Sequence, residues 1–373
     1  MKVLVVFGTR PEAIKMCPLV LELKKYKDME TTLCITGQHR EMLDQVINVF
    51  KLKADYNLSI MKDKQTLSMI TSEVLNKMEL IIEETNPDIV LVHGDTTTSF
   101  AAGLAAFYHN VPVGHVEAGL RTYDINAPYP EEFNRQAVDI FTKFYFAPTN
   151  GAKHNLIKEG KKESDIYVTG NTVIDALNTT ISDTYYNEHI EWAKGSKLIL
   201  VTAHRRENIG LPMEEMFSAI RKIVCDNSDV KVIYPIHKNP AVREIAYKHL
   251  NNHERIRLIE PLDVIDFHNF IKNSYFIMTD SGGVQEEAPS LGKPVLVMRN
   301  TTERPEGVDA GTLKLVGTKF EKIYEEAMTL LCDNDVYEKM SRASNPYGDG
   351  HASERIVGVI RKYAENISNF TSL

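Results

Sequence analysis

Two acidic residues stand directly after apolar runs that are typical of buried β-strands. Asp95 follows residues 88–92 in the segment VHGDTTT, and Glu117 follows residues 111–116 in the segment GHVEAG. Because consecutive strands of βαβ units are usually neighbours, both carboxylates are expected at one edge of a sheet. Burial and mutual repulsion there would raise at least one pKa, which suits proton transfer. Asp95 has an alternative role as the N-cap of a helix beginning at Thr96, whereas Glu117 has no such role.

A third candidate acid opens a later helix. The segment PYPEEFNRQ places Glu131 and Glu132 in a first helical turn and Arg135 one turn later. Compensation of the helix dipole, together with an ion pair between residues four apart, would account for these charges without catalysis.

Positive side chains follow the first strand of each half of the chain. In FGTRPEAIK, Gly8 permits a tight turn, the following helix offers free N–H groups, and Arg10 and Lys15 add positive charge. A phosphate group could bind there, although an ordinary βα turn with a solvated arginine has the same sequence. In LVTAHRREN, His204 and Arg205 stand directly after a strand, which favours an anionic ligand over a solvated run of charges.

The segment YPIHKNP repeats this pattern more weakly, because a lone histidine such as His237 is often structural.

The segment TDSGGVQEEAPSLG carries the strongest physical signal. Ser281, Gly282 and Gly283 form a loop between a strand and a helix, and such a loop presents backbone N–H groups to a diphosphate. Glu287, about one helical turn later, could accept hydrogen bonds from ribose hydroxyls. Arg304, in TTERPE after the next strand, adds positive charge at the same rim. The alternative is a glycine-bearing βα loop without a ligand.

Apolar runs alternate with segments of helical periodicity, which predicts an α/β fold with parallel sheets. Strands are expected at residues 3–7, 32–36, 88–92, 111–116, 144–147 and 166–169, and then at 198–203, 230–235, 256–260, 275–280, 294–298 and 312–317. This pattern predicts two doubly wound, Rossmann-like domains, residues 1–170 and 171–352, with a C-terminal helix at 353–373 that joins the first domain. The carboxyl ends of both sheets would face one cleft, with the motifs around it.

Composition excludes several classes of protein. The formal charge of −8 argues against a nucleic-acid binder, and four widely spaced cysteines indicate neither a zinc site nor a disulfide framework. No apolar run is long enough to span a membrane or to form a signal peptide. We therefore expect a cytoplasmic protein.

The ordered motifs resemble those of the non-hydrolysing bacterial UDP-N-acetylglucosamine 2-epimerases over nearly the whole chain, from FGTRPEAIKM through QHREMLDQV, VHGDTTT, HVEAGLRT, PYPEE, TAHRREN and TDSGGVQEEAPSLGKPVLV to NPYGDG. The resemblance implies a GT-B-like fold, interconversion of UDP-GlcNAc and UDP-ManNAc, no redox cofactor or metal, and a homodimer. The product would supply ManNAc units for bacterial surface polysaccharides.

The resemblance also implies roles for individual residues. The acid/base carboxylates would be Asp95, Glu117 and Glu131. Groups contacting the diphosphate, ribose and uracil and further active-site charges would be Arg10, Lys15, Arg135, His204, Phe267, Ser281, Gly282, Gly283, Glu287 and Arg304.

Members of this family can bind a second UDP-GlcNAc as an activator. That site resembles Gln38, Glu41, Lys64, Gln65, Arg205 and His237 here. Where some relatives carry glutamine and arginine, this chain has Glu41 and Lys64. A carboxylate cannot donate a hydrogen bond and lysine lacks the bidentate fork of arginine, so the match is incomplete.

The chemistry expected from these groups is elimination of UDP to give 2-acetamidoglucal, followed by re-addition with protonation from the other face. Three alternatives stay open: a hydrolysing epimerase that releases ManNAc and UDP, a GT-B glycosyltransferase, and a sensor that binds the nucleotide sugar without turnover.

Overall fold

The computed structural model describes residues 1–37, 40–62 and 65–371. The chain divides into two compact units. Unit 1 comprises Met1–Thr179 and Tyr347–Leu373, and unit 2 comprises Thr180–Pro346. Within the described ranges, every helix is too short or too polar to cross a membrane.

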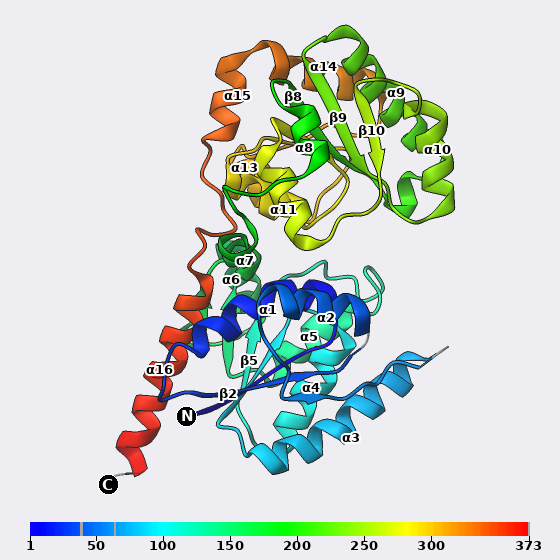
Figure 1. The fold of residues 1–373 in the computed structure, drawn as a ribbon. Helices are drawn as coiled ribbons and strands as arrows, with labels where there is room; N and C mark the ends of the chain where they lie inside the picture. Colours follow the sequence, from blue (N-terminus) through cyan, green and yellow to red (C-terminus); the bar gives the residue numbers. More distant parts are fainter. Residues whose placement is uncertain (38–39, 63–64, 372–373) are drawn as a thin grey trace. The chain divides into compact units, whose positions relative to one another are not determined.

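The described part of unit 1 forms a seven-stranded parallel sheet in the order β3-β2-β1-β4-β5-β6-β7. Figure 1 shows the ribbon of the chain coloured along the sequence. The strands are β1 (Lys2–Phe7), β2 (Glu30–Ile35), β3 (Tyr56–Asn57), β4 (Ile89–His93), β5 (Val113–Val116), β6 (Phe144–Ala147) and β7 (Ile166–Val168). Helices cover both faces of the sheet, so central strands such as β4 are buried along their whole length. This burial explains why they appear in the sequence as continuous apolar runs.

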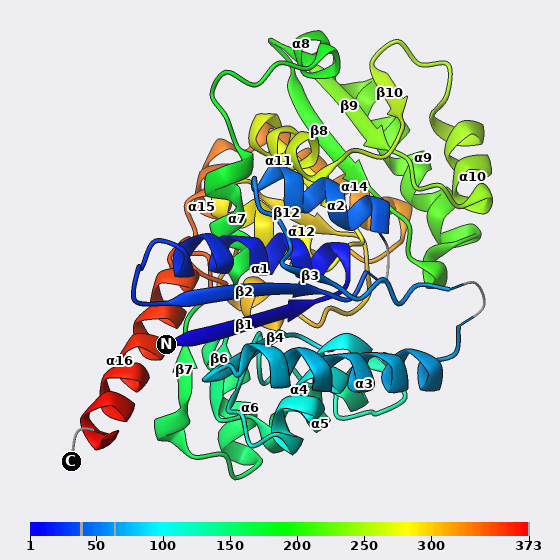
Figure 2. The same cartoon turned by 60° about the horizontal axis from the view of Figure 1, so that its bottom comes forward.

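The helices of unit 1 are α1 (Arg10–Leu23), α2 (Arg40–Val49), α3 (Leu67–Thr85), α4 (Thr97–Tyr108), α5 (Glu131–Phe141), α6 (Asn150–Lys158), α7 (Thr172–Thr180) and α16 (Ala352–Thr371), with a 3-10 turn at Glu163–Asp165. Helices α3, α4 and α5 pack side by side on one face of the sheet, and α1 and α2 lie on the other (Figure 2). The C-terminal helix α16 packs against α1 and so belongs to unit 1.

Unit 2 contains a six-stranded parallel sheet among its described residues, in the order β10-β9-β8-β11-β12-β13. The strands are β8 (Lys197–Thr202), β9 (Val230–Pro235), β10 (Ile256–Ile259), β11 (Phe276–Thr279), β12 (Val295–Val297) and β13 (Leu313–Leu315). The helices are α8 (Glu188–Ala193), α9 (Leu211–Asp226), α10 (Pro240–Leu250), α11 (Val264–Asn273), α12 (Val284–Glu287), α13 (Pro305–Asp309), α14 (Phe320–Cys332) and α15 (Asn334–Ser341), with 3-10 turns at Arg206–Asn208 and Ala288–Leu291.

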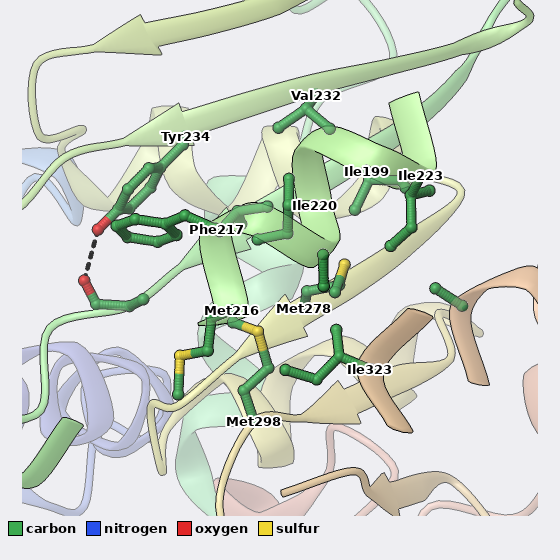
Figure 3. Packing of buried hydrophobic residues seen from close by; sticks show 14 of the residues in the cluster. Ile199, Met216, Phe217, Ile220, Ile223, Val232, Tyr234, Met278, Met298 and Ile323 are labelled. Carbon is green, nitrogen blue, oxygen red and sulfur yellow. Dashed lines mark hydrogen bonds between the residues drawn. The ribbon is translucent and has the colours of Figure 1, made fainter. Parts of the chain in front are cut away.

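The core of unit 2 is built between its sheet and helices α9 and α14. Phe217 and Ile220 of α9 pack towards Tyr234 of β9 and Ile323 of α14, and all four are fully buried (Figure 3). The Tyr234 hydroxyl donates a hydrogen bond of 2.5 Å to the carbonyl of Ala203, directly after β8. This bond satisfies the polar end of a buried ring and ties the start of the next loop to the core.

Both sheets share one topology, which confirms the prediction of two doubly wound, Rossmann-like domains. In unit 1 the strand order reverses between β1 and β4, and in unit 2 it reverses between β8 and β11. Ligands of such sheets bind at the carboxyl ends of the strands beside this switch point. Strand β3 was not predicted, because a two-residue strand leaves no periodic pattern.

The division between the units differs from the expected one near residues 170 and 171. The segment after β7 belongs to unit 1, because the Asn171 N–H donates a hydrogen bond of 2.7 Å to the Tyr347 carbonyl. The Asp175 carboxylate also accepts hydrogen bonds from the backbone N–H groups of Ala352 and Ser353, at 3.1 and 2.7 Å. Helix α7 is therefore bonded to the start of α16, and unit 2 begins only at Thr180.

Candidate active site

The loop after β1 is closed by a capping box. The Thr9 hydroxyl accepts a hydrogen bond from the Glu12 N–H, and the Glu12 carboxylate accepts from the Thr9 N–H. Arg10 is the first residue of α1 and lies at the partly exposed loop. A Cβ on Gly8 would collide with the hydroxyls of Thr36 and Thr98, so this glycine is required by close packing rather than by the turn that was predicted.

Glu117 lies in a buried, positively charged environment directly after β5. Its backbone has a φ of 67°, a left-handed conformation that is uncommon for a residue with a side chain. The carboxylate is ion-paired with Lys15 of α1 and accepts a hydrogen bond of 3.0 Å from the Asn171 amide. His93 Nε2 lies 3.6 Å from the same carboxylate oxygen, and neither ring nitrogen has a hydrogen-bond partner in the described part of the chain.

These neighbours determine the charge of Glu117. Burial disfavours its ionised form, but the charges of Lys15 and His93 outweigh burial and hold the pKa of Glu117 well below its ordinary value. The expectation that burial and repulsion would raise the pKa is therefore wrong for Glu117. The pKa is lowered by two basic side chains, from α1 and β4. Both are distant from Glu117 in the sequence, so local pattern did not predict this contact.

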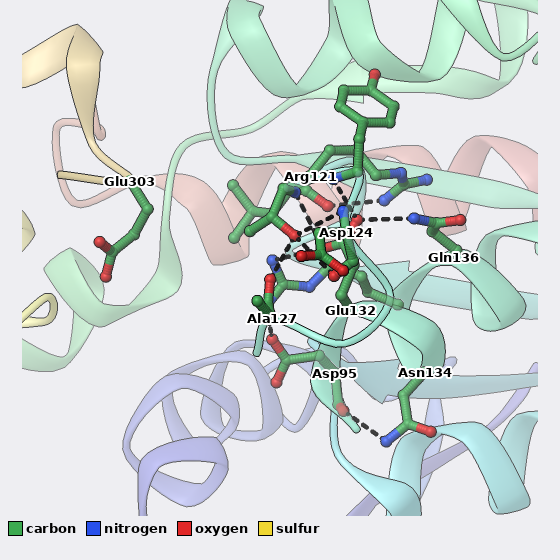
Figure 4. Close-up of polar contacts among 12 residues, drawn as sticks. Asp95, Arg121, Asp124, Ala127, Glu132, Asn134, Gln136 and Glu303 are labelled. Carbon is green, nitrogen blue, oxygen red and sulfur yellow. Dashed lines mark hydrogen bonds and ion pairs between the residues drawn. The ribbon is translucent and has the colours of Figure 1, made fainter. Parts of the chain in front are cut away.

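Asp95 follows β4 and is held by two residues of α5. Arg135 forms an ion pair with the Asp95 carboxylate. The Asn134 amide donates a hydrogen bond of 2.9 Å to the backbone carbonyl of Asp95 (Figure 4). The N-cap of α4 is Thr96, whose hydroxyl accepts from the Ser99 N–H. The alternative role of Asp95 as a helix cap is thus excluded. Since the Gly94 N–H bonds to the Val116 carbonyl at 2.9 Å, Asp95 and Glu117 extend from bonded neighbouring strands.

Glu131 is the first residue of α5 and is only partly buried. Its carboxylate has no hydrogen bond or ion pair with any other described residue, so the expected ion pair with Arg135 is not formed. Arg135 pairs instead with Asp95 and, at 3.4 Å, with Glu132. Glu132 is fully buried and accepts 3.0 Å hydrogen bonds from the backbone of the 122–123 segment (Figure 4).

A buried ion network contacts the backbone of the loop that carries Asp95. The two ring nitrogens of His115 contact the Asp139 carboxylate at 2.6 Å and the Gly94 carbonyl at 2.8 Å. Arg121 bonds to the other oxygen of Asp139 at 2.7 Å and to both oxygens of Glu159. Although burial opposes ionisation, His115 and Arg121 hold the pKa of Asp139 below its ordinary value.

In unit 2, the buried carboxylate of Asp280 organises the cationic loop after β8. It accepts the backbone N–H of His204 at 3.0 Å, the N–H of Arg205 at 2.9 Å and the Asn208 amide at 3.0 Å. Arg205 also donates through Nε to the Asp280 carbonyl at 2.8 Å and pairs with Glu303 at 2.8 Å. The HRREN segment is therefore bonded to the end of β11.

His204 and His237 lie together at the ends of β8 and β9. Their rings are stacked, with centroids 5.4 Å apart. Burial lowers the pKa of His204, and its positively charged neighbours add to this effect, although Asp280 opposes it. A neutral imidazole in this position can donate a hydrogen bond to an anion while remaining able to take a proton.

The loop at 281–283 is fixed by side chains on both sides. The Ser281 N–H donates a hydrogen bond of 2.9 Å to the Thr279 hydroxyl. The side-chain amide of Gln285 donates a hydrogen bond of 3.0 Å to the Ser281 carbonyl. A Cβ on Gly282 would lie 3.1 Å from Glu303 and 3.2 Å from Arg304, and one on Gly283 would lie 3.4 Å from Glu287. The glycines thus allow several charged side chains to approach the loop backbone.

The remaining candidates of unit 2 surround this loop. Glu287 ends α12, and its carboxylate lies 3.6 Å from Nε2 of the buried His268. Phe267 of α11 is partly buried against the core. Arg304 pairs with Glu286 at 2.8 Å and with Glu303 at 3.1 Å, so acids already compensate its charge.

The structure describes only some of the residues that were predicted to form an activator site. Gln38 and Lys64 lie outside the described residues, as does the side chain of Glu41. The Gln65 side chain donates a hydrogen bond of 2.5 Å to the Ile60 carbonyl and accepts one of 2.9 Å from the Lys62 N–H. These bonds stabilise the local turn.

Several residues that contact these loops or the candidate acids were missed by sequence reasoning. They are Glu12, His93, His115, Asp139, Asn171 and Asp280. A signal existed for Asp280 and His93, which stand at strand ends inside motifs already singled out. Asp139 and Asn171 carried none, because their partners are distant in the sequence.

Comparison with known proteins gives a consistent result. Residues 21–361 match the family model of UDP-N-acetylglucosamine 2-epimerase. The UDP-N-acetylglucosamine 2-epimerase of Bacillus subtilis is 62% identical, over 96% of this chain and 94% of the relative. The S. aureus MnaA–UDP co-structure is similar with a TM-score of 0.88 and 56% identity, covering 98% of this chain and 97% of that one. The UDP-GlcNAc 2-epimerase of Neisseria meningitidis bound to UDP-GlcNAc gives a TM-score of 0.88 and 48% identity, covering 97% and 100%.

Proposed function

Because the chain belongs to the UDP-N-acetylglucosamine 2-epimerase family, we propose that it interconverts UDP-GlcNAc and UDP-ManNAc without hydrolysis. The observation that carries this proposal is the pair of strand-end acids in unit 1, one of which is held ionised in a buried basic environment. The relatives solved with UDP and with UDP-GlcNAc support the nucleotide sugar as the substrate class.

The reaction proceeds in two balanced halves. In the first, the bond between C-1 and the diphosphate oxygen breaks with its electron pair leaving on UDP, and the C-2 proton passes to a carboxylate. A C-1=C-2 double bond forms, which gives 2-acetamidoglucal. In the second half, the UDP oxygen bonds again to C-1 and a carboxylic acid protonates C-2 from the opposite face. This order is chemically necessary because the C-2 hydrogen becomes acidic only as oxocarbenium character develops at C-1.

The acids of unit 1 suit this sequence. A carboxylate whose pKa is held low is ionised but weakly basic, so Glu117 can stabilise positive charge at C-1 and take a proton only once C–O cleavage has begun. Asp95 and Glu131 are the partners for protonation on the other face. Lys15 and Arg135 hold two of these carboxylates in place.

The groups of unit 2 suit a departing nucleotide. His204 and the N–H groups of Ser281, Gly282 and Gly283 are assigned to the diphosphate, together with Arg10 of unit 1. Glu287 is assigned to the ribose and Phe267 to the uracil. Arg304, already paired with two acids, contributes chiefly by shaping the loop.

The proposed product is a donor of ManNAc units for surface polysaccharides, and a second UDP-GlcNAc is proposed as an activator. The test of the activity is product identification by proton NMR after incubation with UDP-GlcNAc. UDP-ManNAc is the expected product. Free ManNAc with UDP would instead identify a hydrolysing enzyme, and unchanged substrate would identify a transferase or a sensor.

We also propose a homodimer that forms through helices α4 and α5. These adjacent helices expose Phe107, Tyr108, Phe133 and Ile140, and Ile140 is 75% exposed. Neighbouring exposed apolar side chains of this size mark an association surface. Sedimentation velocity should give twice the chain mass for the wild type. Ile140→Glu should shift the protein to the monomer, and a wild-type monomer would contradict the proposal.

A further inference from the structure

We propose that Glu12 and Asp280 are a matched pair of positioning residues, each holding together the two loops at the switch point of its own sheet. The inference rests on the proposed function, because it concerns how the reacting groups of that function are kept in register. Neither residue belongs to the acid/base or nucleotide-contacting set assigned above.

The topology creates the need for such residues. β1 and β4 are bonded neighbours in unit 1, and β8 and β11 are bonded neighbours in unit 2. At a switch point, the helices that follow the two strands lie on opposite faces of the sheet, so the two loops diverge. Backbone hydrogen bonds between the strands end where the loops begin, and a side chain has to bridge the gap.

In unit 1 this bridge is Glu12. One carboxylate oxygen accepts the N–H groups of Gly8 and Thr9 at 3.1 and 2.8 Å, in the loop after β1. The other oxygen accepts a hydrogen bond from the Thr96 hydroxyl at 2.8 Å, at the N-cap of α4 directly after β4. It also lies 3.1 Å from the hydroxyl of Ser99 in the first turn of α4, which donates at 2.5 Å to the His93 carbonyl as well. Glu12 is 2% exposed. A capping box explains the first pair of bonds but not the second, which joins the loop of Arg10 to the loop of Asp95.

In unit 2 the bridge is Asp280, which has no exposed surface. It stands at the end of β11, directly before Ser281, and accepts the backbone N–H groups of His204 and Arg205 and the amide of Asn208, all in the loop after β8. A single carboxylate thus sets the position of the His204 backbone relative to the 281–283 loop.

Both carboxylates bind loop backbone that would otherwise have unsatisfied donors. Replacing either by its amide removes the negative charge that strengthens these bonds and leaves a single acceptor oxygen, so the side chain holds the loop backbone more weakly. The loops should then shift, and a displacement near 1 Å at reacting groups can cost about 10²-fold in rate. The two units are predicted to respond differently, because their loops have different roles.

The experiment compares Glu12→Gln and Asp280→Asn with Asp175→Asn. Asp175 of α7 is a buried carboxylate that also accepts two backbone N–H groups, but these belong to the start of α16 and not to the loops after β1, β4, β8 or β11. For each variant, UDP affinity is measured by calorimetry, kcat and KM by product formation, and folding by thermal melting. Asp280→Asn should weaken UDP binding about ten-fold or more. Glu12→Gln should lower kcat by about 10²-fold with UDP affinity little changed, and Asp175→Asn should change neither.

Two milder variants keep the inference testable if an amide variant does not fold. Ser99→Ala removes the contact of the first turn of α4 with Glu12, together with the Ser99 bond to the His93 carbonyl, and leaves the capping box intact. Asn208→Ala removes one bond to Asp280. They should reproduce the same split, a lower kcat for the first and weaker UDP binding for the second. Foldable variants whose kcat and UDP affinity match those of Asp175→Asn would overturn the inference. A wild type that neither binds UDP nor forms UDP-ManNAc would instead overturn the proposed function.

Discussion

Glu117→Gln is expected to lower kcat for the conversion of UDP-GlcNAc by about 10³-fold, because acid–base groups contribute on that order to a proton-transfer step. Glutamine keeps the shape of the side chain but cannot take a proton, and Lys15 loses its anionic partner. UDP affinity should be retained, since the groups assigned to the nucleotide lie mainly in unit 2. The measurement is steady-state product formation beside UDP binding by calorimetry.

Glu22→Gln is a matched control for this substitution. Glu22 is a buried acid of the same unit that pairs with Lys25 at 2.5 Å, so the change of charge is the same. Its kcat should stay near that of the wild type. If Glu117→Gln retains kcat within about ten-fold of the wild type, far from the expected acid–base contribution, Glu117 is not the group that moves the proton.

Asp139→Asn is expected to destabilise the fold by about 3–5 kcal/mol, because removing one partner of a buried ion network leaves the other charges uncompensated. The substitution affects His115 and Arg121 together. Chemical unfolding at neutral pH measures the loss. Glu163→Gln, which breaks only an exposed pair with Lys153, should leave the free energy of unfolding nearly unchanged.

The stabilisation from Asp139 should depend on pH in one direction. Its pKa is lowered in the folded state, so the unfolded state, with a carboxyl pKa of about 3.9, binds a proton first. The contribution is complete above that value and is lost as pH falls towards the folded-state pKa. The gap in unfolding free energy between wild type and Asp139→Asn should therefore shrink below about pH 4. A gap that is constant or widens on acidification would contradict the ionised network.

Much of the fold could be predicted from the sequence, because buried parallel strands are continuous apolar runs and the loops after them carry the motifs. The two sheets agree with a GT-B-like pair of Rossmann-like domains. The boundary could not be predicted, since the bond between Asn171 and Tyr347 joins residues distant in the chain.

The residues of the candidate site could be predicted from the sequence better than their electrostatic environment. The strand-end positions of Asp95 and Glu117 follow from local pattern, but the basic side chains that contact their carboxylates come from α1, β4 and α5. Glu12 shows the same limit. In the sequence it is an ordinary first-turn acid, and only the folded chain brings the hydroxyls of Thr96 and Ser99 to it.

The central claim is that a carboxylate exchanges the C-2 proton while UDP is detached from the sugar. It is tested most directly by running the wild-type reaction on UDP-GlcNAc in heavy water and observing C-2 of the product by proton NMR. The account predicts UDP-ManNAc that carries deuterium at C-2, because the proton bound by the carboxylate is replaced from solvent. UDP-ManNAc that retains its original hydrogen at C-2 would contradict it.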